Sequence, residues 1–143
     1  MKQSSDAALA RYRPWFYAAA LYNLVWGGVN ILFPDLFFKL IGMQQPNYPA
    51  LWQVVSMFIL VYVPAYWWVA QQPSRHRHFI LIGFLGKILG PVGYIWSVTV
   101  GQLPPGFGWT ILTNDIIWLP AFYLYLRDAA RTSGGVAALL RGE

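Results

Sequence analysis

Residues 79–100 read FILIGFLGKILGPVGYIWSVTV, and residues 108–126 read GWTILTNDIIWLPAFYLYL. Each run approaches the roughly 20 apolar residues that a helix needs to cross a bilayer. The first run nevertheless contains Lys87, and the second contains Asp115. A charge inside a membrane-spanning segment is costly unless it is paired or faces a polar cavity. These two residues therefore mark the candidate functional interior of a small membrane protein.

The composition agrees with a lipid environment. Of the 143 residues, 57% are hydrophobic and only 10% are charged, with a mean hydropathy of +0.44. A soluble domain carries about 25% charged residues. Residues 14–33 and 50–70 form two further long apolar runs, and because no cleavage site followed by a soluble body comes after the first run, we expect it to be retained. We predict an all-α protein with a single integral membrane domain over 1–143, built as a bundle of four transmembrane helices.

The cations indicate the orientation. They precede the first run, fill the loop between the second and third runs, and follow the fourth: Lys2, Arg11, Arg13, Arg75, Arg77, Arg127, Arg131 and Arg141. The loops on the opposite side contain only Lys39. Because cytoplasmic loops are enriched in Lys and Arg, we expect both termini and the 71–78 loop to lie in the cytoplasm, and the protein to belong to a bacterial inner membrane.

A short helix is expected over 34–42, directly after the first run. Pro34 suits a first helical turn, Asp35 suits the positive end of the helix dipole, and Gly42 can end the helix. The apolar residues of this segment share one face, so we expect it to lie flat on the outer leaflet. The alternative is that it caps the outer end of the bundle.

The depths of the two charges suggest that they meet. With about 1.5 Å of rise per residue and a core of about 30 Å, Lys87 lies about 13 Å above the cytoplasmic edge and Asp115 about 10 Å below the outer edge. The gap of about 6 Å is within reach of an extended lysine side chain. We therefore predict a Lys87–Asp115 pair.

Other polar and aromatic residues fall at similar depths on all four runs. The candidate ligand-binding set, with the two charges as catalytic residues if the protein is an enzyme, is Asn23, Trp26, Asn30, Gln53, Ser56, Lys87, Asn114, Asp115 and Trp118. The alternative is that the neutral members join helices through hydrogen bonds, at about 0.6 kcal/mol per contact. The high cost of a central charge favours a pocket over such structural contacts.

Glycines form a stripe on the third run, at Gly83, Gly86, Gly90 and Gly93. Small residues at helical spacing let another backbone approach closely. The stripe predicts a packing seam within the chain, or alternatively a dimer face.

Several functions are disfavoured by the residues. With no cysteine, the chain cannot perform thiol chemistry or ligate an Fe–S cluster. His76 and His78 lie in a loop rather than in a span, which argues against a buried haem or metal site. We expect no metal, no cofactor and no nucleic-acid partner, because nucleic-acid binding needs a solvated basic face.

The stretch from Trp26-Gly27-Gly28 to Phe33-Pro34-Asp35-Leu36-Phe37, followed by three more apolar runs, resembles the DoxX-like group of small four-helix membrane proteins. In that group a glycine-containing first helix often ends in a Phe-x-x-Pro-like segment. The resemblance implies a four-helix fold and, as in some members, a role as an accessory subunit of a membrane oxidoreductase complex.

Three functions are weighed. The first is a membrane protein whose pocket binds a small hydrophobic or lipid-like molecule, with a membrane-protein partner or a homodimer as its assembly. The second is an enzyme of the isomerase or hydrolase type that acts on a lipid-soluble substrate, with Asp115 as acid or base. The third is a small dimeric transporter in which Asp115 couples transport to protons.

Overall fold

The computed structural model describes residues 2–141, which are helical throughout apart from turns and loops. The elements in chain order are α1 (Lys2–Leu9), η1 (Ala10–Tyr12), α2 (Arg13–Leu32), α3 (Leu36–Leu40), α4 (Pro49–Gln71), α5 (Arg77–Thr99), η2 (Pro105–Phe107), α6 (Gly108–Asn114), η3 (Ile116–Trp118), α7 (Leu119–Thr132) and α8 (Val136–Arg141). The predicted all-α class is confirmed.

Two helices meet the length and composition of a membrane span. Helices α4 and α5 have 23 residues each, with mean hydropathies of 1.5 and 1.7 in their most apolar windows. At about 1.5 Å per residue, each exceeds the thickness of a hydrocarbon core of about 30 Å. Within residues 2–141, no other helix meets this combination of length and composition. The four-span arrangement therefore stays a proposal.

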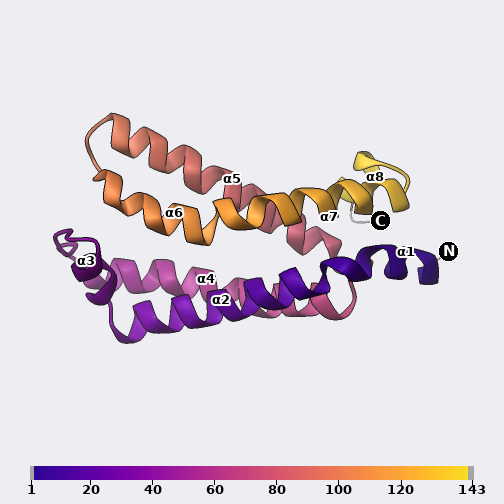
Figure 1. Cartoon of the computed structure of the whole chain (residues 1–143), viewed down its shortest axis with the longest axis horizontal. Helices are drawn as coiled ribbons and strands as arrows, with labels where there is room; N and C mark the ends of the chain where they lie inside the picture. The colour runs from indigo at the N-terminus through magenta and orange to yellow at the C-terminus, as the bar shows by residue number, and fades with distance from the viewer. Residues whose placement is uncertain (1, 142–143) are drawn as a thin grey trace.

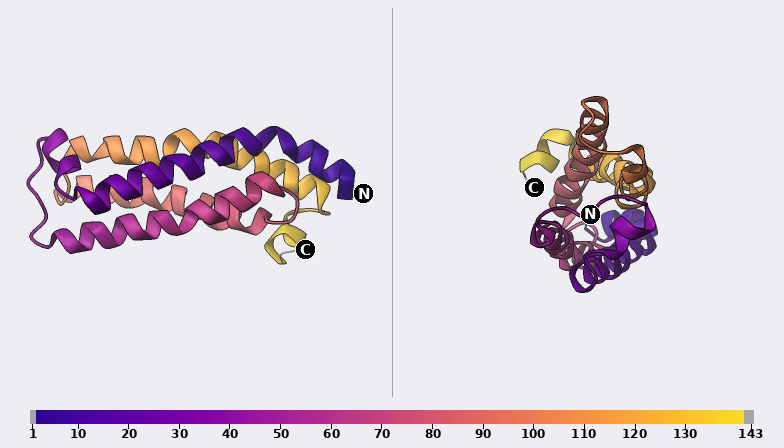
Figure 2. Two further views of the ribbon diagram at one scale, coloured as in Figure 1. Left: turned by 90° about the horizontal axis from the view of Figure 1, so that it is seen from below. Right: turned by 90° about the vertical axis from the view of Figure 1, so that its left-hand side faces the viewer.

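The long helices form two hairpins that lie side by side as an elongated body (Figure 1, Figure 2). Helix α2 packs along α4, and α5 packs along α6 and α7. Both chain ends lie at one end of this body, which we call the terminal end. Helix α3 and the turn between α5 and α6 lie at the opposite end, which we call the α3 end.

Prolines and glycines set the boundaries of the rods. Proline begins α4 at Pro49 and lies in the first turn of α2, where its missing N–H costs no helical hydrogen bond. Gly42 follows α3 with φ of +66°, and Gly101 follows α5 with φ of +74°. Such left-handed conformations suit glycine because it has no Cβ.

The largest buried cluster lies at the terminal end. The rings of Phe16 and Tyr125 are 4.8 Å apart and those of Tyr66 and Phe122 are 5.3 Å apart, in edge-to-face arrangements that aromatic pairs favour. The hydroxyl of Tyr125 donates to the carbonyl of Pro73, which joins α7 to the loop after α4. We call this group the aromatic cluster.

Packing at the α3 end differs from the sequence expectation. Phe38 is buried and its ring lies 5.0 Å from that of Trp52, while Phe37 stacks on Trp52 at 5.4 Å. Leu40, on the face expected to meet the outer leaflet, is 76% exposed. Helix α3 therefore covers the ends of α2 and α4 through its two phenylalanines, which agrees with the capping alternative.

The expected continuous helix over 108–126 is wrong. The chain leaves α-helical geometry at Asp115, forms the 3-10 helix η3, and resumes the α-helix at Leu119. Pro120 contributes, because it has no N–H to bond the carbonyl of Ile116. The second piece, α7, then continues beyond residue 126 to Thr132.

Candidate functional site

The site is built on this helix break. Asp115 has φ of −120° and ψ of −63°, and the N–H of Trp118 bonds to the Asp115 carbonyl at 3.1 Å instead of reaching back to Asn114. The carbonyls of Thr113 and Asn114 therefore need other partners. The indole N–H of Trp118 donates to Thr113 at 2.9 Å. The partner of Asn114 comes from another helix.

Lys87 of α5 supplies that partner. Its side chain is buried, and Nζ donates to the backbone carbonyl of Asn114 while lying 5.5 Å from the centre of the Phe122 ring. The last carbonyls of a helix carry partial negative charge, so an ammonium is stabilised there. The carbonyl that the helix break leaves free and the buried ammonium group thus satisfy each other's need for a hydrogen-bond partner.

Asp115 lies on the same side of α5 as Lys87. Its carboxylate packs against the backbone of Gly90, so closely that a Cβ at that position would clash with it. No ion pair joins Lys87 and Asp115 within the described residues, although the two charges face one cavity. The predicted direct pair is replaced by a lysine–carbonyl bond with the carboxylate nearby.

These groups line a central cavity of about 170 Å³ between the two hairpins. Its walls come from α2, α4, α5 and the helix break: Asn23, Ile59, Tyr62, Tyr66, Gly83, Gly86, Lys87, Asn114 and Asp115. Four of the nine predicted site residues, namely Asn23, Lys87, Asn114 and Asp115, therefore meet at one place.

The remaining five predicted residues lie elsewhere. Asn30 accepts the indole N–H of Trp52 at 2.9 Å, and Gln53 donates to the carbonyl of Ile31 at 2.8 Å. Ser56, fully buried, donates to a carbonyl of its own helix. The contacts of Asn30 and Gln53 hold α2 against α4, as the structural alternative expects. Trp118 is buried in the aromatic cluster, and Trp26 lines a separate groove described below.

Sequence reasoning missed Tyr62 and Tyr66, whose rings are 5.6 Å apart on α4. Both line the central cavity, and a Cβ at Gly83 would come within 2.7 Å of the Tyr66 hydroxyl. The signal was their spacing of four residues in the middle of an apolar run. Because tyrosines are common at membrane interfaces, the pattern alone did not distinguish cavity-lining tyrosines from interfacial ones.

The glycine stripe is largely internal. Gly83 faces Tyr66, Gly86 lies near Tyr62, and Gly90 faces Asp115, while a Cβ at Gly93 would meet nothing within 4 Å. The first three glycines of the stripe therefore belong to a packing seam within the chain, which is the first of the two alternatives that the sequence predicts.

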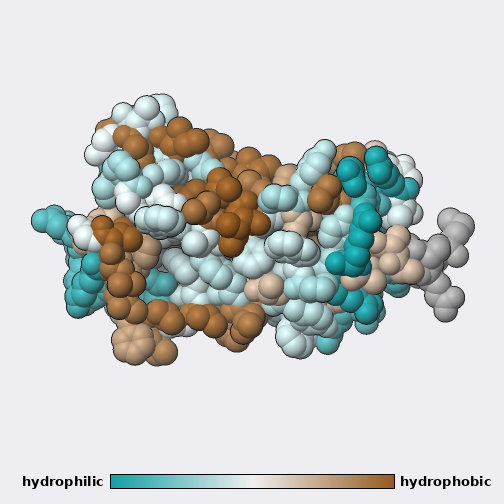
Figure 3. All heavy atoms as spheres, in the orientation of Figure 1, coloured by the Kyte–Doolittle hydropathy of each residue, from teal (hydrophilic) through white to brown (hydrophobic). Residues whose placement is uncertain are grey.

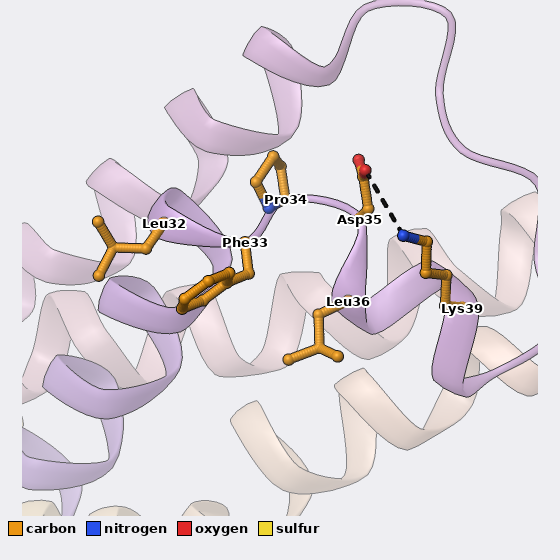
Figure 4. A pocket seen from close by; sticks show the side chains of 6 residues that line it. All are labelled: Leu32, Phe33, Pro34, Asp35, Leu36 and Lys39. Atoms are coloured by element: carbon orange, nitrogen blue, oxygen red, sulfur yellow. Dashed lines mark ion pairs between the residues drawn. The ribbon is translucent and has the colours of Figure 1, made fainter.

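Two adjoining hollows lie at the α3 end. The α2–α3 groove has a volume of about 260 Å³ and is lined by Tyr22, Val25, Trp26, Val29, Asn30, Leu36, Phe37 and Leu40. The second, which we call the α3 hollow, has about 420 Å³ and is lined by Leu32, Phe33, Pro34, Asp35, Leu36 and Lys39 (Figure 4). Leu36 belongs to both.

A charged cluster at the terminal end joins α7 to the N-terminal segment. Asp128, almost buried, accepts hydrogen bonds from the Tyr12 hydroxyl at 2.6 Å, from Arg127 at 3.0 Å and from Arg11. The bond from Tyr12 is the main reason that the pKa of Asp128 is lowered to about 2, and both arginines act in the same direction. This contact fixes α1 and η1 against α7.

Comparison with known proteins adds no further constraint: no protein-family model, curated protein or solved structure matches this chain.

Proposed function

We propose that this chain is an integral membrane protein with four spans and cytoplasmic termini, and that its central cavity binds part of a small or lipid-like molecule. The spans would be α2, α4, α5 and residues 108–126 of the divided α6–α7 segment. The DoxX-like resemblance adds to this proposal a role as an accessory subunit of a membrane complex in a bacterial inner membrane.

The surface supports a lipid environment. No residue of α5 that follows Lys87 in the sequence is buried. Leu89, Ile95 and Trp96 in this part are each more than half exposed. Water would be a poor solvent for such a face, because large exposed apolar patches are rare on soluble monomers. The most hydrophilic side chains gather near the two ends of the face in Figure 3, with apolar and weakly polar residues between them.

The observation that carries the binding proposal is the convergence of polar groups on one cavity. Asn23 of α2, Lys87 of α5 and the adjacent residues Asn114 and Asp115 come from three separate parts of the chain and meet around it. Helix contacts alone could be made from neutral residues, whereas a buried charge costs about 2.5–3.5 kcal/mol even on the lower scales. Irregular backbone at membrane depth is tolerated where it is buried or lines a wet cavity.

The size of the cavity limits its ligand. A volume of about 170 Å³ exceeds that of single waters, which take about 30 Å³ each in the liquid. It is smaller than the roughly 300–1,000 Å³ of sites that enclose a drug-sized ligand. We infer that a small polar group enters the cavity between Lys87 and Asp115, and that any apolar remainder lies between the hairpins.

The test uses molecules that copurify with the protein. We would extract the full chain in mild detergent and identify bound molecules by mass spectrometry, for the unchanged chain, Lys87→Met and Asp115→Asn. Gln53→Met is the control, because it removes a polar group outside the cavity. We expect a bound species that both cavity variants lose and the control keeps. The same bound species in all four proteins would overturn the proposal.

The enzyme alternative is favoured by one specific feature. The Asp115 carboxylate has no ion-pair partner within the described residues and faces a cavity that also contains two tyrosines and a lysine, so proton transfer groups surround one space. Turnover of an extracted lipid by the unchanged chain, lost in a folded Asp115→Asn variant, would support it. The transporter reading loses part of its support, because Gly83 and Gly90 of the stripe closely face side chains of the same chain rather than a second copy.

A further inference from the structure

The hollows at the α3 end adjoin at Leu36 and together form an amphipathic site outside the central cavity. The α2–α3 groove is almost entirely apolar, and its polar member Asn30 is already engaged by Trp52 and by the carbonyl of Trp26. It passes at Leu36 into the α3 hollow, which contains both a cation and an anion. An apolar channel that ends in a charged mouth matches the two parts of a phospholipid.

The charges at the mouth are of opposite sign and close together. Lys39 Nζ lies 3.9 Å from a carboxylate oxygen of Asp35, and the two side chains are 69% and 43% exposed. Figure 4 shows both side chains on one side of α3, above Leu36. Lys39 is also the single cation expected on this side of the membrane. An exposed pair of this kind contributes little to stability, so its groups are free to bind a partner.

Resting on the membrane placement proposed above, we propose that this site binds one phospholipid with an ethanolamine head group. The Lys39 ammonium would contact the lipid phosphate, and the Asp35 carboxylate would accept hydrogen bonds from the ethanolamine ammonium. One acyl chain would lie in the α2–α3 groove along Val25 and Val29.

The charge pattern selects this head group over its common relatives. A choline head has no N–H to donate to Asp35, and charge-assisted hydrogen bonds are the strong ones. A glycerol head has no cation, so Asp35 would lie close to an anionic lipid without compensation. Of these three head groups, only ethanolamine offers an anion and a hydrogen-bonding cation joined by a short linker.

The experiment is a competition between head groups. The delipidated full chain in detergent would be incubated with equal amounts of three phospholipids that share their acyl chains and carry ethanolamine, choline or glycerol heads. Native mass spectrometry would count the bound lipids. We expect the ethanolamine lipid to be preferred by about threefold, which corresponds to one exposed charge contact.

Five variants locate the site. Asp35→Asn should remove the preference, and Lys39→Met should weaken binding of all three lipids. Val29→Trp should block the groove, while Leu24→Trp, exposed on the same helix but outside the groove, should bind as the unchanged chain does. Lys87→Met should leave this binding intact, which separates the site from the central cavity.

Three results would overturn the inference: equal binding of the three lipids, a preference that survives Asp35→Asn, or undiminished binding by Val29→Trp. A dimer that excludes lipid from the groove would also contradict it. Failure of the membrane placement is recognised separately, because the chain would then be released from membranes by an alkaline carbonate wash.

Discussion

Replacing Gly90 with alanine tests the geometry of the site most directly. A Cβ at Gly90 would lie 3.0 Å from Cγ of Asp115 and closer still to one carboxylate oxygen. Real Cβ atoms do not approach other atoms this closely, so the Asp115 side chain must turn away. Gly93→Ala is the matched control, since its Cβ would meet nothing within 4 Å and it lies one turn further along the same helix.

The expected magnitude follows from three contributions. Replacing glycine by alanine inside a helix is favourable by about 1 kcal/mol, and this term is common to both variants. Forcing Asp115 from its rotamer costs about 0.5–1.5 kcal/mol. Moving the carboxylate away from the nearby Lys87 ammonium adds about 1 kcal/mol. We therefore expect Gly90→Ala to be less stable than Gly93→Ala by about 1–3 kcal/mol.

Reversible unfolding in mixed micelles of mild detergent and sodium dodecyl sulfate would measure this difference. A double-mutant cycle with Asp115→Ala assigns its cause, because removing the carboxylate removes the clash and should restore Gly90→Ala to the level of the control. Equal stability of the two alanine variants, within about 0.5 kcal/mol, would refute the placement of Asp115.

Three further predictions concern other parts of the molecule. Lys87→Met should lower the unfolding free energy by about 1–3 kcal/mol, because it leaves a buried carbonyl unpaired, whereas Lys39→Met should change it by less than about 1 kcal/mol; thermal melting in detergent compares them. Asp128 has a folded pKa of about 2 against an ordinary value of 3.8, so its contribution is present above pH 3.8 and is lost as the pH falls toward 2; the slope of stability in this window should flatten in Asp128→Asn, and an unchanged slope would contradict the assignment. Gly27→Ala should lower the melting temperature, because its Cβ would come within 2.8 Å of two Leu60 side-chain atoms and 3.1 Å of a backbone oxygen, whereas Gly28→Ala meets nothing within 4 Å and should not.

The sequence predicted the helices well where composition alone decides them. Apolar runs bounded by proline and glycine placed α2, α4 and α5 within a few residues of their observed bounds. The prediction failed in the last run, 108–126, because a helix break depends on which groups replace the lost backbone hydrogen bonds. That replacement comes from Lys87, a residue on another helix.

The site was predicted in part for the same reason. The cost of buried charge singled out Lys87 and Asp115, and the structure places both at one cavity. Their direct pairing could not be judged from depth, because the competing partner of Lys87 is a backbone carbonyl that becomes available only when the helix breaks. The amide residues were ambiguous, and contacts rather than depth separated Asn23 from Asn30.

The position of the aromatic cluster makes resistance to local opening uneven along the molecule. Its buried rings tie all the long rods together at the terminal end, whereas no side chain of α5 after Lys87 is buried. Amide hydrogens around Phe122 and Tyr125 should therefore exchange with solvent far more slowly than those near Val92. Separation of the hairpins at the α3 end, with the cluster intact, would give the proposed ligand a route to Lys87 without global unfolding.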